Sequence, residues 1–208
     1  MTALSILDHA AVLVFALTGA LVASRAQLDI VGFAFLACLT AVGGGTVRDL
    51  LLDRHPIFWL SAPTYLLLAS VAAVVVFFTA HLLESRYRVL LWLDSVALGV
   101  AVAAGVAAAT AVGQPAAIVV LMGVITGCLG GLMRDVVANE VPLVLKQGEL
   151  YVSAAFGGAL AAVLAAPFLP GTLWQLALCI GVTWALRAGS IAFGWRLPVY
   201  RARPPRNR

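Results

Sequence analysis

Seven apolar runs, each roughly 20 residues long, alternate with short polar stretches over nearly the whole chain. A helix needs about 20 predominantly apolar residues to cross the hydrocarbon core of a bilayer. The runs cover approximately residues 7–24, 30–47, 64–83, 89–112, 116–133, 150–166 and 172–194. The pattern predicts an all-α membrane protein with seven transmembrane helices and almost no soluble part.

Composition supports this class and excludes others. The 208 residues are 63% hydrophobic and 11% charged, whereas soluble domains are about 45–50% apolar and about 25% charged. A soluble fold could not hydrate such a surface, and a disordered chain is excluded for the same reason. Cys38, Cys128 and Cys179 lie inside apolar runs without metal-ligand spacing. We therefore expect no metal site and no other cofactor.

An internal repeat with an offset of 86 residues relates the first three runs to the next three. Composition bias can align alanines and leucines, but hardly Gly, Arg-Asp, Pro and Tyr in one register. The offset aligns Gly44-Gly45 with Gly130-Gly131, Arg48-Asp49 with Arg134-Asp135, Leu7-Asp8 with Leu93-Asp94, Pro56 with Pro142 and Tyr65 with Tyr151. We divide the chain into a first repeat at 1–86, a second at 87–170, and a seventh helix with a basic tail at 171–208.

Topology follows from the odd number of helices in each repeat. The second copy must enter the membrane from the opposite side, which predicts a 3+3 inverted repeat as in many transport proteins. The seventh helix then puts the two termini on opposite faces. Most Lys and Arg residues, including five arginines in the last thirteen residues, fall on one side, with Arg48 and Arg54 on the other. By the positive-inside rule, the N-terminus is outside and the C-terminus cytoplasmic, and the basic tail indicates topology rather than a nucleic-acid partner.

The candidate site is the doubled glycine motif in the second and fifth runs. Consecutive glycines permit a kink or break, and irregular backbone at membrane depth persists where it is buried or lines a water-filled cavity. A break would free carbonyls near Thr40 and Thr126 to replace the hydration shell of a cation. The predicted pathway residues are Thr40, Gly43, Gly44, Gly45, Arg48, Asp49, Thr126, Gly130, Gly131, Arg134 and Asp135. The alternative is that the glycines only allow close helix crossing; their recurrence in both halves favours a pathway.

The charged pairs that follow the glycines also have two interpretations. They lie at the membrane interface, or they face the interior with each repeat's Arg paired to the Asp of the other repeat. We favour the interior. Asp8 and Asp94, near the start of the first and fourth runs, are interpreted as helix N-caps. The chain is not expected to be an enzyme, because these pairs are accompanied by no nucleophile, ligand cluster or phosphate-binding loop.

These motifs resemble the prokaryotic TRIC family, the trimeric intracellular cation channels. The shared signature is Gly-Gly-x-x-Arg-Asp in both halves, here Gly44 to Asp49 and Gly130 to Asp135. The resemblance covers both repeats and the seventh helix. It implies a homotrimer in a bacterial or archaeal plasma (inner) membrane, in contact with membrane lipids, with a pore in each subunit between kinked second and fifth helices. It also implies conduction of potassium or other monovalent cations.

The resemblance has limits. Animal members carry a Lys-Glu-Val element that binds phosphoinositide, where this chain has Val47-Arg48-Asp49, so that regulation is not implied. Some bacterial relatives are described as glycine transporters. The alternative function is therefore a carrier for a small neutral amino acid, whose carboxylate would meet a half-helix N-terminus and whose amine would meet Asp49 or Asp135. The scarcity of polar groups for a substrate pocket favours a channel.

Overall fold

The computed structural model describes residues 3–83, 85–169 and 171–200. The tail arginines from Arg201 onward lie outside the described residues. The described part is built of helices: α1 Ala3–Arg25, α2 Ile30–Leu51, α3 Phe58–Ser61, α4 Thr64–Thr79, η1 Ala80–Leu82, α5 Arg86–Ala111, α6 Ala116–Val137, η2 Leu143–Leu145, α7 Val152–Ala165 and α8 Thr172–Phe193.

The all-α membrane fold is confirmed. Six helices are long and apolar enough to cross a membrane, namely α1, α2, α4 with η1, α5, α6 and α8. The remaining predicted span is α7, which is apolar but only 14 residues long. At 1.5 Å per residue it extends about 21 Å. The second and fifth predicted spans are α2 and α6, and both continue about four residues beyond the predicted ends to include their Arg-Asp pairs.

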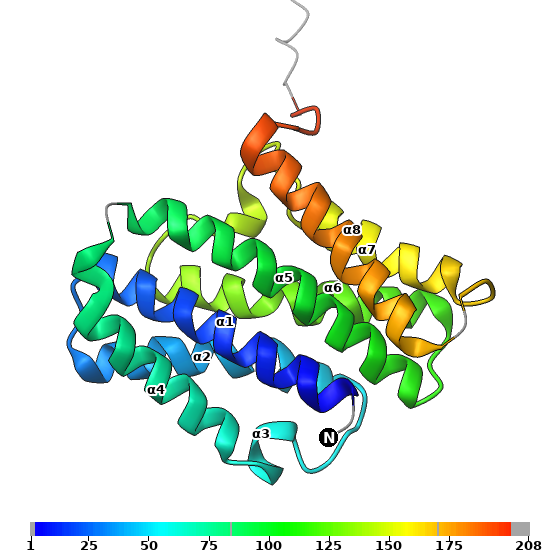
Figure 1. The fold of residues 1–208 in the computed structure, drawn as a ribbon, viewed down its shortest axis with the longest axis horizontal. Helices are drawn as coiled ribbons and strands as arrows, with labels where there is room; N and C mark the ends of the chain where they lie inside the picture. Colours follow the sequence, from blue (N-terminus) through cyan, green and yellow to red (C-terminus); the bar gives the residue numbers. More distant parts are fainter. Residues whose placement is uncertain (1–2, 84, 170, 201–208) are drawn as a thin grey trace, which may run out of the picture.

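The helices are arranged as two similar groups around a central pair. Figure 1 shows α1 and α5 running in opposite directions through the middle of the molecule. The first packs with α2 and α4, the second with α6 and α7, and α8 packs on α5 and α7. This antiparallel relation agrees with an inverted repeat.

The central pair is closely packed because small side chains line it. Buried alanines include Ala16, Ala20 and Ala23 on α1 and Ala97, Ala101 and Ala104 on α5. Association of membrane helices depends on such van der Waals contact between small residues. The most buried helices of the bundle are therefore the first helix of each repeat.

α2 and α6 end in the same way. The backbone N–H of Leu52 donates to the carbonyl of Arg48, and that of Ala138 donates to the carbonyl of Arg134. One residue later the backbone turns left-handed, with φ of 51° at Asp53 and 55° at Asn139, residue types that tolerate this conformation. All these positions are related by the 86-residue offset.

Candidate functional site

The glycine motif marks the place where α2 crosses α6. A Cβ added to Gly44 would lie 2.3 Å from the carbonyl oxygen of Thr126, and one added to Gly130 would lie 2.6 Å from the carbonyl oxygen of Thr40. A larger residue at either position would therefore push the helices apart. Small residues allow membrane helices to approach this closely.

The glycines do not interrupt either helix, so the expected break is wrong. α2 continues through Gly43-Gly44-Gly45 and α6 through Gly130-Gly131. The carbonyls of Thr40 and Thr126 instead face the opposite glycine, where Cα–H···O contacts form at close helix crossings. The threonine hydroxyls donate within their own helices, to Leu36 and Met122, each at 2.6 Å. Close packing thus satisfies these groups without a break.

Two buried clusters of charged side chains flank the crossing. The Arg48 cluster consists of Asp8, Arg48, Asp49 and Arg54. Arg48 donates from Nη1 to Asp8 Oδ1 at 2.7 Å and from Nε to Asp49 Oδ1 at 2.9 Å. Arg54 donates to the same Asp49 oxygen at 3.0 Å, and the backbone N–H of Phe58 donates to Asp49 Oδ2. Arg48 is fully buried, and two positive charges face two negative ones.

The Arg134 cluster consists of Thr18, Asp94, Arg134 and Asp135. Arg134 donates from Nη1 to Asp94 Oδ1 at 2.7 Å and to the Thr18 hydroxyl at 2.9 Å. Its Nε donates to Asp135 Oδ1 at 2.7 Å. The backbone N–H of Leu143 donates to Asp135 Oδ2. The two Arg–Asp contacts of the first cluster therefore recur at equivalent positions, while the backbone donor, Leu143, is one residue before the equivalent of Phe58.

The two clusters differ in net charge and in how completely their hydrogen-bonding atoms are paired. Glu140 stands where the offset would place the equivalent of Arg54, and it pairs with Arg25 at 3.1 Å instead. The Arg134 cluster therefore has one more negative than positive side chain. Three buried atoms beside it, Asp94 Oδ2, Arg134 Nη2 and the Tyr151 hydroxyl, have no hydrogen-bond partner among the described residues. A Cβ on Gly131 would lie 3.1–3.5 Å from these same side chains.

The predicted pairing between the two repeats is wrong. Each Arg binds the Asp next to it and the Asp on the first helix of its own repeat. Asp8 lies on α1, which packs on α2, and Asp94 lies on α5, which packs on α6, so each carboxylate reaches the arginine of its own repeat. The interior location is correct, since Arg48, Asp49, Arg134 and Asp135 are buried.

The N-cap interpretation of Asp8 and Asp94 is also wrong. α1 extends back to Ala3, and α5 begins at Arg86 with Ser85 as its cap. Both aspartates therefore lie inside helices as ion-pair partners. The repeat offset already aligned Asp8 with Asp94, and Tyr65 with Tyr151, and this alignment was the signal that could have identified them.

A cavity of about 10 Å³ lies beside the crossing, between α1, α2, α5 and α6. This volume corresponds to about one water molecule. Its walls include Asp8, Phe15, Gly44, Gly45, Phe58 and Thr126. The predicted site residues Thr40, Gly43, Arg48, Asp49, Gly130, Gly131, Arg134 and Asp135 are not among its lining residues. Within the described residues, no group of three or more His, Cys, Asp or Glu side chains could hold a metal ion.

Comparison with known proteins places this geometry in a family. A family model described as glycine transporter matches residues 5–81 and 91–167, two segments offset by 86 residues. A UPF0126 membrane protein of Vibrio cholerae is 36% identical over 203 residues, covering 95% of this chain and 82% of that one. The UPF0126 inner membrane protein YadS of Escherichia coli is 37% identical over 199 residues, covering 93% and 94%.

Solved structures of TRIC channels are also similar to this chain. The TRIC trimeric intracellular cation channel orthologue from Rhodobacter sphaeroides matches with a TM-score of 0.89 and 41% identity, covering 93% of this chain and all of that one. The chain belongs to the prokaryotic TRIC family. A prokaryotic TRIC channel determined in 0.5 M KCl matches with a TM-score of 0.86 and 29% identity, covering 92% and 96%. This TRIC protein is accordingly an integral membrane protein and not an enzyme, and its structural relatives support cation-channel activity.

Proposed function

We propose that this TRIC protein is a potassium-permeable channel that forms a homotrimer, with a pathway through each subunit between α2 and α6. The observation that carries the proposal is the narrow cavity at the helix crossing, whose lining residues include Asp8, Thr126 and the two glycines Gly44 and Gly45. The trimer is inferred from the relatives named as trimeric channels. The remaining predicted site residues would surround and support this pathway without lining the cavity: Thr40, Gly43, Arg48, Asp49, Gly130, Gly131, Arg134 and Asp135.

Electrostatics supports a cation as the permeating species. The Arg48 cluster is neutral as a set, because two arginines face two aspartates. The Arg134 cluster has one excess carboxylate, and Asp94 Oδ2 has no partner among the described residues. In a low-dielectric environment one unbalanced charge acts strongly on a nearby ion. An anion would be repelled at this cluster and a cation attracted.

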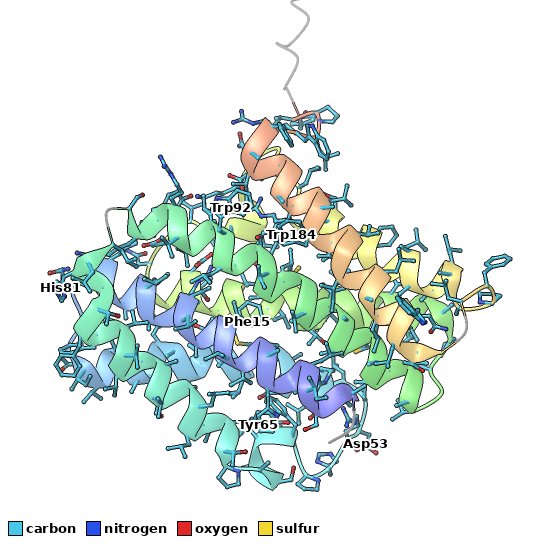
Figure 2. The ribbon with its side chains drawn as sticks, viewed as in Figure 1. Phe15, Asp53, Tyr65, His81, Trp92 and Trp184 are labelled. Carbon is cyan, nitrogen blue, oxygen red and sulfur yellow. The ribbon has the colours of Figure 1, made fainter. Side chains whose placement is uncertain are left out.

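The cavity in this conformation is too narrow for a hydrated ion, so conduction requires it to widen. Phe58 limits the cavity on the side of the Arg48 cluster, with its ring against Gly45 and centred 5.4 Å from the Arg48 guanidinium carbon. Phe15 lies near the middle of the bundle (Figure 2). Movement of these two rings would widen the cavity.

The test is flux through purified protein in liposomes. A potassium gradient is expected to give unitary currents that do not saturate at low ion concentration. Thr126→Val, which removes the hydroxyl of a cavity-lining residue with little change of shape, should lower the conductance severalfold. The matched control is Thr183→Val, a buried threonine on α8 away from the crossing. Equal conductance in the two variants, or saturable uptake without unitary current, contradicts the proposed pathway.

The second candidate is a glycine carrier, which the description of the matching family favours. Both oxygens of Asp49 and of Asp135 already accept hydrogen bonds. A zwitterion would therefore meet Asp94 Oδ2 with its amine and Arg134 Nη2 with its carboxylate, since these two groups have no described partner. Saturable uptake of labelled glycine, driven by a proton or sodium gradient in the same liposomes, would establish this alternative.

A further inference from the structure

A second, larger cavity lies at one end of the bundle, away from the α2–α6 crossing. Its volume is about 270 Å³, and it opens where α1 and α4 end and α2 and α5 begin. His81, one of its lining residues, lies at this end of the molecule, and Asp53 lies near the opposite end (Figure 2). Because four membrane helices terminate around it, the cavity is at the depth where lipid headgroups meet water. We call it the Arg86 pocket.

The Arg86 pocket has one apolar and one cationic side. Phe33 and Phe77 pack edge to face at 5.0 Å between ring centroids and form the apolar wall. Gln27, His81 and Arg86 supply the polar side. A small soluble anion would leave the aromatic wall uncontacted, whereas a headgroup with its attached chain would contact both sides.

The charge of Arg86 is available to a ligand. Its Nη1 donates to the carbonyl of Ser24 at 3.2 Å, and it forms no ion pair among the described residues. The described carboxylates of the neighbouring segments are already engaged. Asp29 accepts from the backbone N–H of Gly32 at 2.8 Å, and Glu140 accepts from Arg25 at 3.1 Å. The first turn of α5 contains no acidic residue.

We propose that the Arg86 pocket binds the phosphate of an anionic phospholipid. A guanidinium binds a phosphate through two parallel hydrogen bonds, and basic groups at a membrane surface attract anionic lipids. The glyceride part of the lipid would lie against Phe33 and Phe77. The site does not depend on the ion pathway and holds for a channel or a carrier.

The test compares two arginines on the same helix. Arg86 lines the pocket, whereas Arg88 is exposed and does not. In nanodiscs of phosphatidylcholine with added phosphatidylglycerol, we expect the wild-type protein to retain phosphatidylglycerol in native mass spectra and to gain thermal stability. Arg86→Gln should weaken this binding by roughly tenfold or more, as expected for the loss of a charged hydrogen bond. Arg88→Gln, with the same charge change, should retain it.

Two comparisons separate a lipid site from attraction by surface charge and from a site for free phosphate. Equal loss in Arg86→Gln and Arg88→Gln would mean attraction by surface charge alone and would overturn the pocket. Inorganic phosphate that stabilises the protein as much as the lipid would overturn the lipid as the ligand. Phe77 is partly exposed, so Phe77→Ala should reduce lipid retention without unfolding the protein. Unchanged retention in this variant also contradicts the proposal.

Discussion

Arg134 makes three hydrogen bonds from one fully buried guanidinium, to Asp94, Asp135 and Thr18. The bonds to Asp94 and Thr18 leave from Nη1 and the bond to Asp135 leaves from Nε, in directions fixed by the planar guanidinium. A lysine ammonium on a flexible stem cannot reproduce this fork. The contacts therefore depend on arginine itself and not only on a positive charge.

We expect Arg134→Lys to destabilise the protein. Each charged hydrogen bond that is lost costs about 1.5–3 kcal/mol. The Asp94 or Asp135 carboxylate that loses its partner would also stay buried and unpaired. The measurement is the unfolding temperature of detergent-solubilised protein. Arg54→Lys is the control, because Arg54 is partly exposed and makes a single contact. A similar small decrease in both variants would contradict the role assigned to the fork.

Phe58 borders the narrow cavity on the side of the Arg48 cluster. If its ring closes the narrow cavity, Phe58→Ala should increase potassium flux severalfold in liposomes. Val144 occupies the equivalent position in the second repeat and is absent from the cavity wall, so Val144→Ala should leave the flux unchanged. A decrease in flux in Phe58→Ala, or an equal change in the control, would show that the ring does not close the path.

At the scale of elements, the packing of α2 against α6 depends on two glycines. A methyl group on Gly44 would lie 2.3 Å from the backbone carbonyl oxygen of Thr126, and this atom cannot move without shifting α6. A Cβ on Gly181 of α8 meets nothing within 4 Å. The same substitution therefore has different consequences on different helices.

Gly44→Ala should lower the free energy of unfolding by about 1–3 kcal/mol, the usual cost of overpacking. Gly181→Ala should leave it unchanged or raise it slightly, because alanine has the higher helix propensity. Thermal unfolding in detergent, followed by circular dichroism, distinguishes the two. Equal stability of both variants would mean that the helices separate at little cost.

At the scale of the whole molecule, we propose that the two termini lie on opposite sides of the membrane, because an inverted repeat followed by one more helix would make an odd number of crossings. We propose, as the positive-inside rule indicates, that the N-terminus is outside and the C-terminus cytoplasmic. The division into repeats at 1–86 and 87–170, with a final unit at 171–208, is part of the same proposal.

Reporter fusions test this orientation. A reporter that is active only in the cytoplasm should be active at the C-terminus and inactive at the N-terminus, and a reporter that requires export should show the opposite pattern. Activity of the same reporter at both ends would contradict the odd number of membrane crossings. The result does not depend on which solute the protein conducts.

Much of this protein was predictable from its sequence because the relevant signals are local or periodic. Apolar runs of about 20 residues identify membrane helices wherever they occur, and the 86-residue offset aligns Arg48 with Arg134 before any packing is known. The family signature is equally local. The fold class, the repeat and the buried location of the charged pairs follow from these signals.

Only the tertiary structure decided which groups touch. Asp8 and Arg48 are 40 residues apart, and nothing in their spacing distinguishes a helix cap from an ion-pair partner. The glycines are equally compatible with a break and with a close crossing until the carbonyl of Thr126 is found opposite Gly44. These contacts depend on how each helix is rotated about its axis when it packs. In a chain where apolar residues surround most helices, the hydrophobic pattern does not specify that rotation.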